Sequence, residues 1–252
     1  MGSDPIYNGG MPVFDANQYP EACPHESIRE IGPDIFFAPG SYRMAPLMRI
    51  SRNMVIVRCG DELTLVNPIR LSAVGEAELE ALGTVRHAVR LGVFHGVDDL
   101  YTVARFGAEF WCQADSDRYA EPKPDHELTE GGPLPIVGAE LFVFRETKKP
   151  ESALLIRHGD GLLITCDGVQ HYGDFNRHSR LAKMTMPIIG FPKSVVVSPL
   201  WLKYLTKKGG SIRPDFERLL ELDFDALISA HGTPLMHGAH AAVGKAVDRA
   251  FK

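Results

Sequence analysis

The feature that most constrains this chain is an apolar run at residues 85–91, which leads into a loop that carries His95 and Asp99. The run has the length and composition of a buried strand. A helix is predicted to begin after the loop, with Asp98 as its N-cap. An imidazole and a carboxylate four residues apart on a loop leaving a strand are suited to binding one metal ion. The rest of the chain must then supply further ligands.

The composition is that of a globular protein: 252 residues, 44% hydrophobic, 23% charged, with a formal net charge of −5. No Lys/Arg stripe is long enough to neutralise a phosphate backbone, so a nucleic-acid partner is not expected. No apolar run reaches about 18 residues, and no membrane partner is expected. The N-terminus lacks a signal-peptide pattern, and the four cysteines form no C-x-x-C pair. We therefore expect a cytoplasmic protein that binds a small-molecule substrate or ligand. The oligomeric state is left open.

Strands and helices are predicted along most of the chain. Residues 1–28 are rich in Gly and Pro and form an irregular lead-in, and residues 29–252 form a single domain. Two β-hairpins are predicted at 54–67 and 152–167. Further strands are expected at 31–38, 84–91, 109–113, 139–146 and 224–230, and helices at 72–82, 98–107, 199–208, 214–222 and 240–251. This order favours two sheets covered by helices.

Three predicted strand ends carry polar side chains that bind metals. His95 and Asp99 follow the first, Asp167 follows the second, and His231 follows the third. Loops at strand ends are where sites are commonly built on a rigid sheet. Imidazole and carboxylate groups suit zinc or iron, and three protein ligands leave a coordination position open. The pattern indicates a metal site.

With these segments in view, the chain resembles the metallo-β-lactamase fold family over roughly residues 30–252. The resemblance rests on the early hairpin, the loop at His95, the hairpin that ends Leu-Leu-Ile-Thr-Cys-Asp167, and the closing segment Phe-Asp-Ala-Leu-Ile-Ser-Ala-His231-Gly232. It implies an α/β (α+β) fold, an αββα four-layer sandwich with a metal site along one edge, and commonly a two-metal hydrolase. The chain looks most like uncharacterised bacterial members with degenerate metal motifs.

The chain departs from the family pattern at three ligand positions. The family loop has the pattern His-x-His-x-Asp-His, and Val97 and Leu100 stand where two of those histidines would be. A further family histidine precedes the second hairpin, where the context Lys-Lys-Pro-Glu-Ser places Lys148. A two-metal mechanism is therefore not expected.

Four ligand positions remain: His95, Asp99, Asp167 and His231. Sorted by the family's two metal positions, the first keeps only His95, whereas the second keeps the other three. The resemblance therefore implies at most one zinc or iron ion, or none. Asp99 and His95 are the expected catalytic residues.

The two carboxylates, Asp99 and Asp167, would repel each other at a partly buried sheet edge. A metal ion would neutralise them, and so would the ammonium of Lys148. A protonated carboxylate is the third solution. With a metal ion, the protein is expected to be a hydrolase of an ester, lactone, thioester or phosphoester. With the ammonium of Lys148 instead, it is expected to be a non-catalytic binding or regulatory domain with a vestigial metal site.

Overall fold

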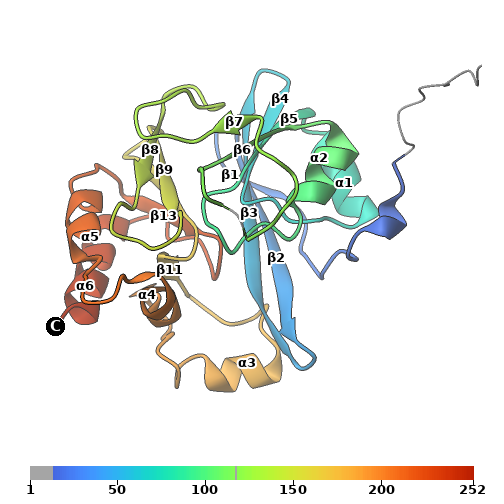
Figure 1. Ribbon diagram of the computed structural model, residues 1–252. Coiled ribbons are helices and arrows are strands. Elements are labelled where there is room, and N and C mark those ends of the chain that lie inside the picture. The colour runs from blue at the N-terminus through green and yellow to red at the C-terminus, as the bar shows by residue number, and fades with distance from the viewer. Residues whose placement is uncertain (1–13, 117) are drawn as a thin grey trace, which may run out of the picture.

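The computed structural model describes residues 14–116 and 118–252 (Figure 1). Of the predicted lead-in at 1–28, residues 1–13 lie outside the described part. Residues 14–28 hold a short 3-10 helix, η1 (Ala16–Gln18), before the first strand. Among the described residues, no helix combines the length and the apolar composition needed to cross a membrane.

The first sheet contains seven strands that are neighbours in chain order, from β1 to β7. Its first four strands are antiparallel and its last three pair in parallel. Gly60, with φ of 63°, makes the turn of the predicted hairpin, which is confirmed. The strands are β1 (Arg29–Gly32), β2 (Ile35–Ala45), β3 (Met48–Cys59), β4 (Glu62–Val66), β5 (Thr84–Val89), β6 (Glu109–Cys112) and β7 (His126–Glu127).

The second sheet contains four strands in the order β13-β10-β9-β8. These are β8 (Ala139–Val143), β9 (Ser152–Ile156), β10 (Leu162–Thr165) and β13 (Ala226–Ser229). After β10 the chain forms a small antiparallel ribbon of two strands, β11 (Val169–His171) and β12 (Val195–Val197). The predicted hairpin at 152–167 is confirmed as β9 and β10.

Helices cover the outer face of each sheet (Figure 1). Helices α1 (Ala73–Glu80) and α2 (Asp99–Phe106) lie on the first sheet, and α4 (Pro199–Leu205), α5 (Arg213–Leu219) and α6 (Ala239–Ala250) lie on the second. Helix α3 (Arg180–Thr185) lies beside the tip of the β2–β3 hairpin. Ser72 caps α1 through Gly75, as predicted.

The alternation of side chains along the strands explains the layers. In β10, Leu163 packs toward the helices and Ile164 packs between the sheets; in β2, Phe36 and Phe37 divide in the same way. Successive strand residues point to opposite faces, so sheets that are apolar on both faces must be covered twice. The result is the predicted αββα sandwich.

One prediction of local structure was too simple. The segment 31–38, expected as one strand, contains the end of β1 at 31–32, a turn at 33–34 with Asp34 in the left-handed region at φ of 59°, and the start of β2 at 35–38. Asp98 is the N-cap of α2, but its side chain makes no cap hydrogen bond. It pairs instead with Arg52 at 3.0 Å.

Leu163 tests the core on the helix side of the second sheet. Its side chain is fully buried at the centre of β10. We expect Leu163→Ala to lower the free energy of unfolding by about 2–5 kcal/mol, because it leaves a cavity. Urea unfolding measures this. Val137→Ala, at a side chain that is 86% exposed, is the matched control and should cost under about 0.5 kcal/mol. Equal losses for the two variants would contradict this packing.

Candidate metal centre

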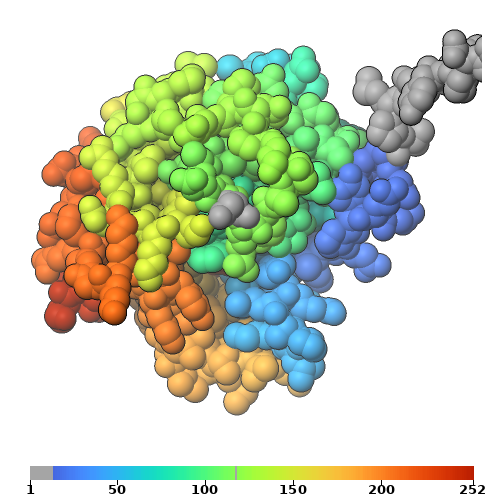
Figure 2. Space-filling model, viewed as in Figure 1, coloured from blue at the N-terminus to red at the C-terminus, as the bar shows by residue number. Residues whose placement is uncertain are grey.

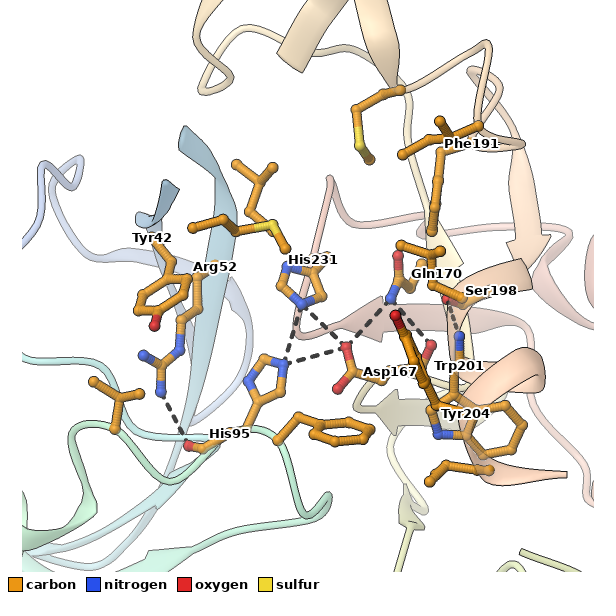
Figure 3. Close-up of a pocket in the computed structure, with 18 of the residues that line it drawn as sticks. Tyr42, Arg52, His95, Asp167, Gln170, Phe191, Ser198, Trp201, Tyr204 and His231 are labelled. Atoms are coloured by element: carbon orange, nitrogen blue, oxygen red, sulfur yellow. Dashed lines mark hydrogen bonds and ion pairs between the residues drawn. The ribbon is translucent and has the colours of Figure 1, made fainter. Parts of the chain in front are cut away.

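Three of the four predicted ligands meet at one point (Figure 3). The Nε2 atoms of His95 and His231 lie 3.1 Å apart. One carboxylate oxygen, Oδ1 of Asp167, lies 3.4 Å from the first and 3.1 Å from the second. The three donor atoms therefore form a nearly equilateral triangle built from segments that are more than sixty residues apart in sequence.

Strand pairing explains two corners of this triangle. Strands β10 and β13 run parallel, with Thr165 opposite Ser229. Asp167 and His231 each come two residues after those partners, so they leave the same edge of the sheet side by side. His95 reaches them from the loop after β5 in the other sheet.

The orientation of His231 is fixed from the opposite sheet. Its Nδ1 lies 2.6 Å from the carbonyl oxygen of Ser51 in β3, which can only accept. Nδ1 therefore carries the proton, and the lone pair of Nε2 points at the other two donors. The next residue, Gly232, has φ of 79°, and an added Cβ there would overlap the carbonyl oxygen of His171.

Asp167 is held by its backbone. Its N–H and that of Gly168 both donate to Oε1 of Glu151, at 2.8 and 2.9 Å. The amide of Gln170 donates to the Asp167 carbonyl oxygen at 3.0 Å. Glu151 is buried, and burial together with the nearby charge of Asp167 raises the pKa of its carboxyl well above the usual value.

The electrostatics favour the deprotonated forms that bind metals. Burial lowers the pKa of His95, and the neighbouring Asp167 opposes this shift only in part. Burial alone would raise the pKa of the Asp167 carboxyl, but the positive charge and the hydrogen bonds that His95 and His231 supply in their protonated forms hold this pKa well below its usual range. With the imidazoles neutral, a divalent cation would take over this role beside the ionised carboxylate.

The triangle opens into a cavity of about 620 Å³ between the two sheets and α4. Most of the lining is apolar, and Figure 3 shows Phe191, Trp201 and Tyr204 on the side opposite His95. Polar groups in the wall include Arg52, which donates to the His95 carbonyl oxygen at 3.0 Å, and Gln170. A molecule of drug-like size fits there.

Asp99, predicted as a ligand and a catalytic residue, lies in a different environment. Its carboxylate is fully buried and pairs with the guanidinium of Arg90 at 3.0 Å, and the structure does not bring it into the donor triangle. The reason is local: α2 begins only at Asp99, so the four-residue spacing from His95 does not place both on one helix face. Burial raises the pKa of Asp99 to about 7, against the opposing charge of Arg90.

The two carboxylates therefore have separate partners. Arg90 faces Asp99, and the two imidazoles face Asp167. Lys148, expected near both carboxylates, is exposed, and its backbone N–H bonds to Leu205. The next residue, Lys149, lines the cavity instead.

Sequence reasoning missed three supporting residues. Arg90 and Arg52 form buried ion pairs with Asp99 and Asp98, and the sequence around Arg52 is polar enough that it gives no sign of this burial. Glu151 stands in the Lys-Lys-Pro-Glu-Ser stretch among other polar residues. Only the structure shows that its carboxyl accepts from the backbone of the Asp167 turn.

The sequence matches no protein-family model and no curated protein. The structure is similar to VMB-1, with a TM-score of 0.64 and 10% identity over 90% of this chain and 98% of that one. It is also similar to the metallo-β-lactamase FIM-1 from Pseudomonas aeruginosa in its mono-zinc form, with a TM-score of 0.61, 12% identity, and 92% and 98% of the two chains covered. A third similar structure is a metallo-β-lactamase from Hirschia baltica, with a TM-score of 0.60 and 14% identity over 89% of this chain and 98% of that one. The chain therefore has the metallo-β-lactamase fold, as its motifs indicated.

Asp99 provides a test of which acid belongs to the centre. We expect Asp99→Ala to lower the free energy of unfolding by about 3 kcal/mol, because Arg90 stays buried without its partner. The same variant should bind as much metal as the wild type. Chemical unfolding and elemental analysis measure the two effects. Asp99→Asn, which keeps the shape, serves as the milder variant. Loss of metal from folded Asp99→Asn would place Asp99 back among the ligands.

Proposed function

We propose that this protein is a hydrolase that uses one metal ion, held by Nε2 of His95, Nε2 of His231 and the carboxylate of Asp167. The observation that carries the proposal is the spacing of these donors, 3.1, 3.1 and 3.4 Å. Three tetrahedral ligands at zinc distances lie roughly 3.3 Å apart, and three octahedral ligands at similar distances roughly 3.0 Å apart. The triangle thus has the dimensions of one face of a zinc or iron coordination sphere.

The residues around the triangle keep it in a binding geometry. Ser51 fixes the tautomer of His231, and Arg52 and Tyr119 hold the His95 loop through the carbonyl oxygens of His95 and Phe94. Such outer contacts raise the basicity of the ligands and fix their direction. The apolar walls of the cavity limit water around a bound substrate.

A divalent ion at this place would supply Lewis acidity, which activates water and polarises a carbonyl or phosphoryl group. The three ligands leave the cavity side open for the substrate. We propose an ester, lactone, thioester or phosphoester as the substrate. The mono-zinc form of FIM-1 supports a single ion in this fold.

The alternative is a non-catalytic binding or regulatory domain with a vestigial site. The observation that favours it is that Asp167 already contacts both imidazoles, so its charge has protein partners without a cation. Under this alternative the cavity is a ligand-binding site and the triangle only stabilises it.

Metal content separates the two proposals. We expect protein purified without chelator to contain about one zinc or iron ion per chain by elemental analysis, because three donors converge. Asp167→Ala and His231→Ala should each reduce this to below about 0.2 ion per chain, since two ligands bind far more weakly than three.

The control is Asp99→Asn, which should retain the ion because Asp99 pairs with Arg90. Hydrolysis of a panel of esters, lactones, thioesters and phosphoesters is then measured with and without added zinc or ferrous ion. Wild-type protein with less than about 0.2 ion per chain after metal addition, unchanged by Asp167→Ala, would leave the binding-domain alternative.

A further inference from the structure

Exposed apolar side chains gather beside the cavity mouth. Six of the twelve large apolar side chains that are exposed in the described chain lie on two short segments, the tip of the β2–β3 hairpin and α3 with the turn after it. We call these six residues the apolar rim: Met44, Leu47, Leu181, Met184, Ile188 and Ile189. Leu47, Met184 and Ile188 are 77%, 71% and 83% exposed. A patch of this kind marks an interaction surface.

The two segments form one structural unit. Ser179, the N-cap of α3, donates its hydroxyl to the Leu47 carbonyl oxygen at 2.9 Å and its backbone N–H to the Arg49 carbonyl oxygen at 2.9 Å. The hairpin tip and α3 therefore project together, and they form the lower end of the molecule in Figures 1 and 2. Leu181 and Met184 have the spacing i, i+3 of one face of α3, and Ile188 lies in the turn that follows the helix.

The hairpin tip and α3 lie within two longer stretches of the sequence that carry only positive formal charge. These stretches, residues 35–60 and 175–214, contain twelve of the 27 Lys and Arg residues and none of the 32 Asp and Glu residues, in a chain of net charge −5. Arg43, Arg49, Arg180 and Lys183 are exposed next to the apolar rim. Apolar side chains flanked by cations match the surface of an anionic membrane, where the apolar groups enter the headgroup layer and the cations pair with phosphates.

A second copy of the chain does not match this surface. In a symmetric dimer the apolar rim of one chain contacts the rim of the other. This contact would bring Arg43, Arg180 and Lys183 of one chain close to the same cations of the second chain. Like charges at such a contact oppose association. An anionic surface has no such conflict.

We propose that the apolar rim and its cations dock this protein onto the surface of anionic phospholipid bilayers. This departs from the expectation, drawn from the lack of a spanning segment, that the protein has no membrane partner. Met44 and Ile189 belong to the rim and also line the cavity. Docking therefore turns the cavity mouth toward the headgroups, which gives molecules from the bilayer a route to the metal centre.

Vesicle co-sedimentation tests the apolar part. We expect the full-length protein to bind vesicles of phosphatidylcholine with roughly one third phosphatidylglycerol, and to bind pure phosphatidylcholine at least about tenfold more weakly. Leu47→Asp and Ile188→Asp should each weaken binding to the anionic vesicles by roughly tenfold or more, since each removes an inserted side chain. Val74→Asp and Val137→Asp add the same charge at side chains that are 72% and 86% exposed elsewhere, and should bind like the wild type.

The cationic part has its own matched pair of variants. Replacing Arg180 and Lys183 together by Gln should weaken binding to the anionic vesicles by roughly twenty-five-fold, at about fivefold for each lost charge. Replacing Lys123, exposed in the loop before β7, and Lys245, exposed on α6, together by Gln should have less than about a twofold effect. Added salt should weaken binding of the wild type.

Four outcomes would overturn the proposal. The first three are equal binding to the anionic and the pure phosphatidylcholine vesicles, no binding to either kind of vesicle, and a loss of binding in Val137→Asp as large as that in Ile188→Asp. The fourth is a wild-type dimer in sedimentation velocity that Ile188→Asp dissociates, without vesicle binding, which would assign the rim to self-association. Asp167→Ala should bind vesicles like the wild type, so this proposal and the proposed metal centre stand or fail separately.

Discussion

The parallel pairing of β10 with β13 is the interaction on which the candidate centre depends. The pair joins two segments about sixty residues apart, and the register of Thr165 with Ser229 brings Asp167 and His231 out of the sheet together. Parallel strands need a long crossover, and here the crossover contains the β11–β12 ribbon and helices α3 to α5. The same connection that sets the donor spacing thus also supplies part of the cavity wall and four of the six residues of the apolar rim.

Much of the architecture was predictable, because local patterns fix it. The hairpins at 54–67 and 152–167 follow from β-rich runs joined by Gly-containing turns, and the capped helix at 72–82 follows from Ser72 and Gly83. Three of the four predicted ligands, His95, Asp167 and His231, do meet. For Asp167 and His231 the position after a strand was informative, because the ends of two neighbouring parallel strands lie side by side.

What the sequence did not reveal depends on contacts between distant segments. Asp99 lies four residues from His95, but it is the first residue of α2 and its carboxylate faces Arg90. Nothing in the order of residues states that Arg90 faces inward, or that Glu151 accepts from the turn at Asp167. Lys148 was expected to replace a lost ligand, and the choice between it and Lys149 depends on one step of register at the end of a loop. Such details follow from packing, not from spacing.

The hydrogen bond from His231 to Ser51 has a mechanical consequence. His231 belongs to one sheet, whereas Ser51 and the loop of His95 belong to the other, so the donor triangle straddles the sandwich. The distances between its donor atoms therefore depend on the separation of the two sheets. A ligand that moves the sheets apart would lengthen these distances and weaken the affinity for an ion. A ligand that draws the sheets together would strengthen this affinity. Filling of the cavity and binding of the proposed cation would thereby be linked through the spacing of the two sheets.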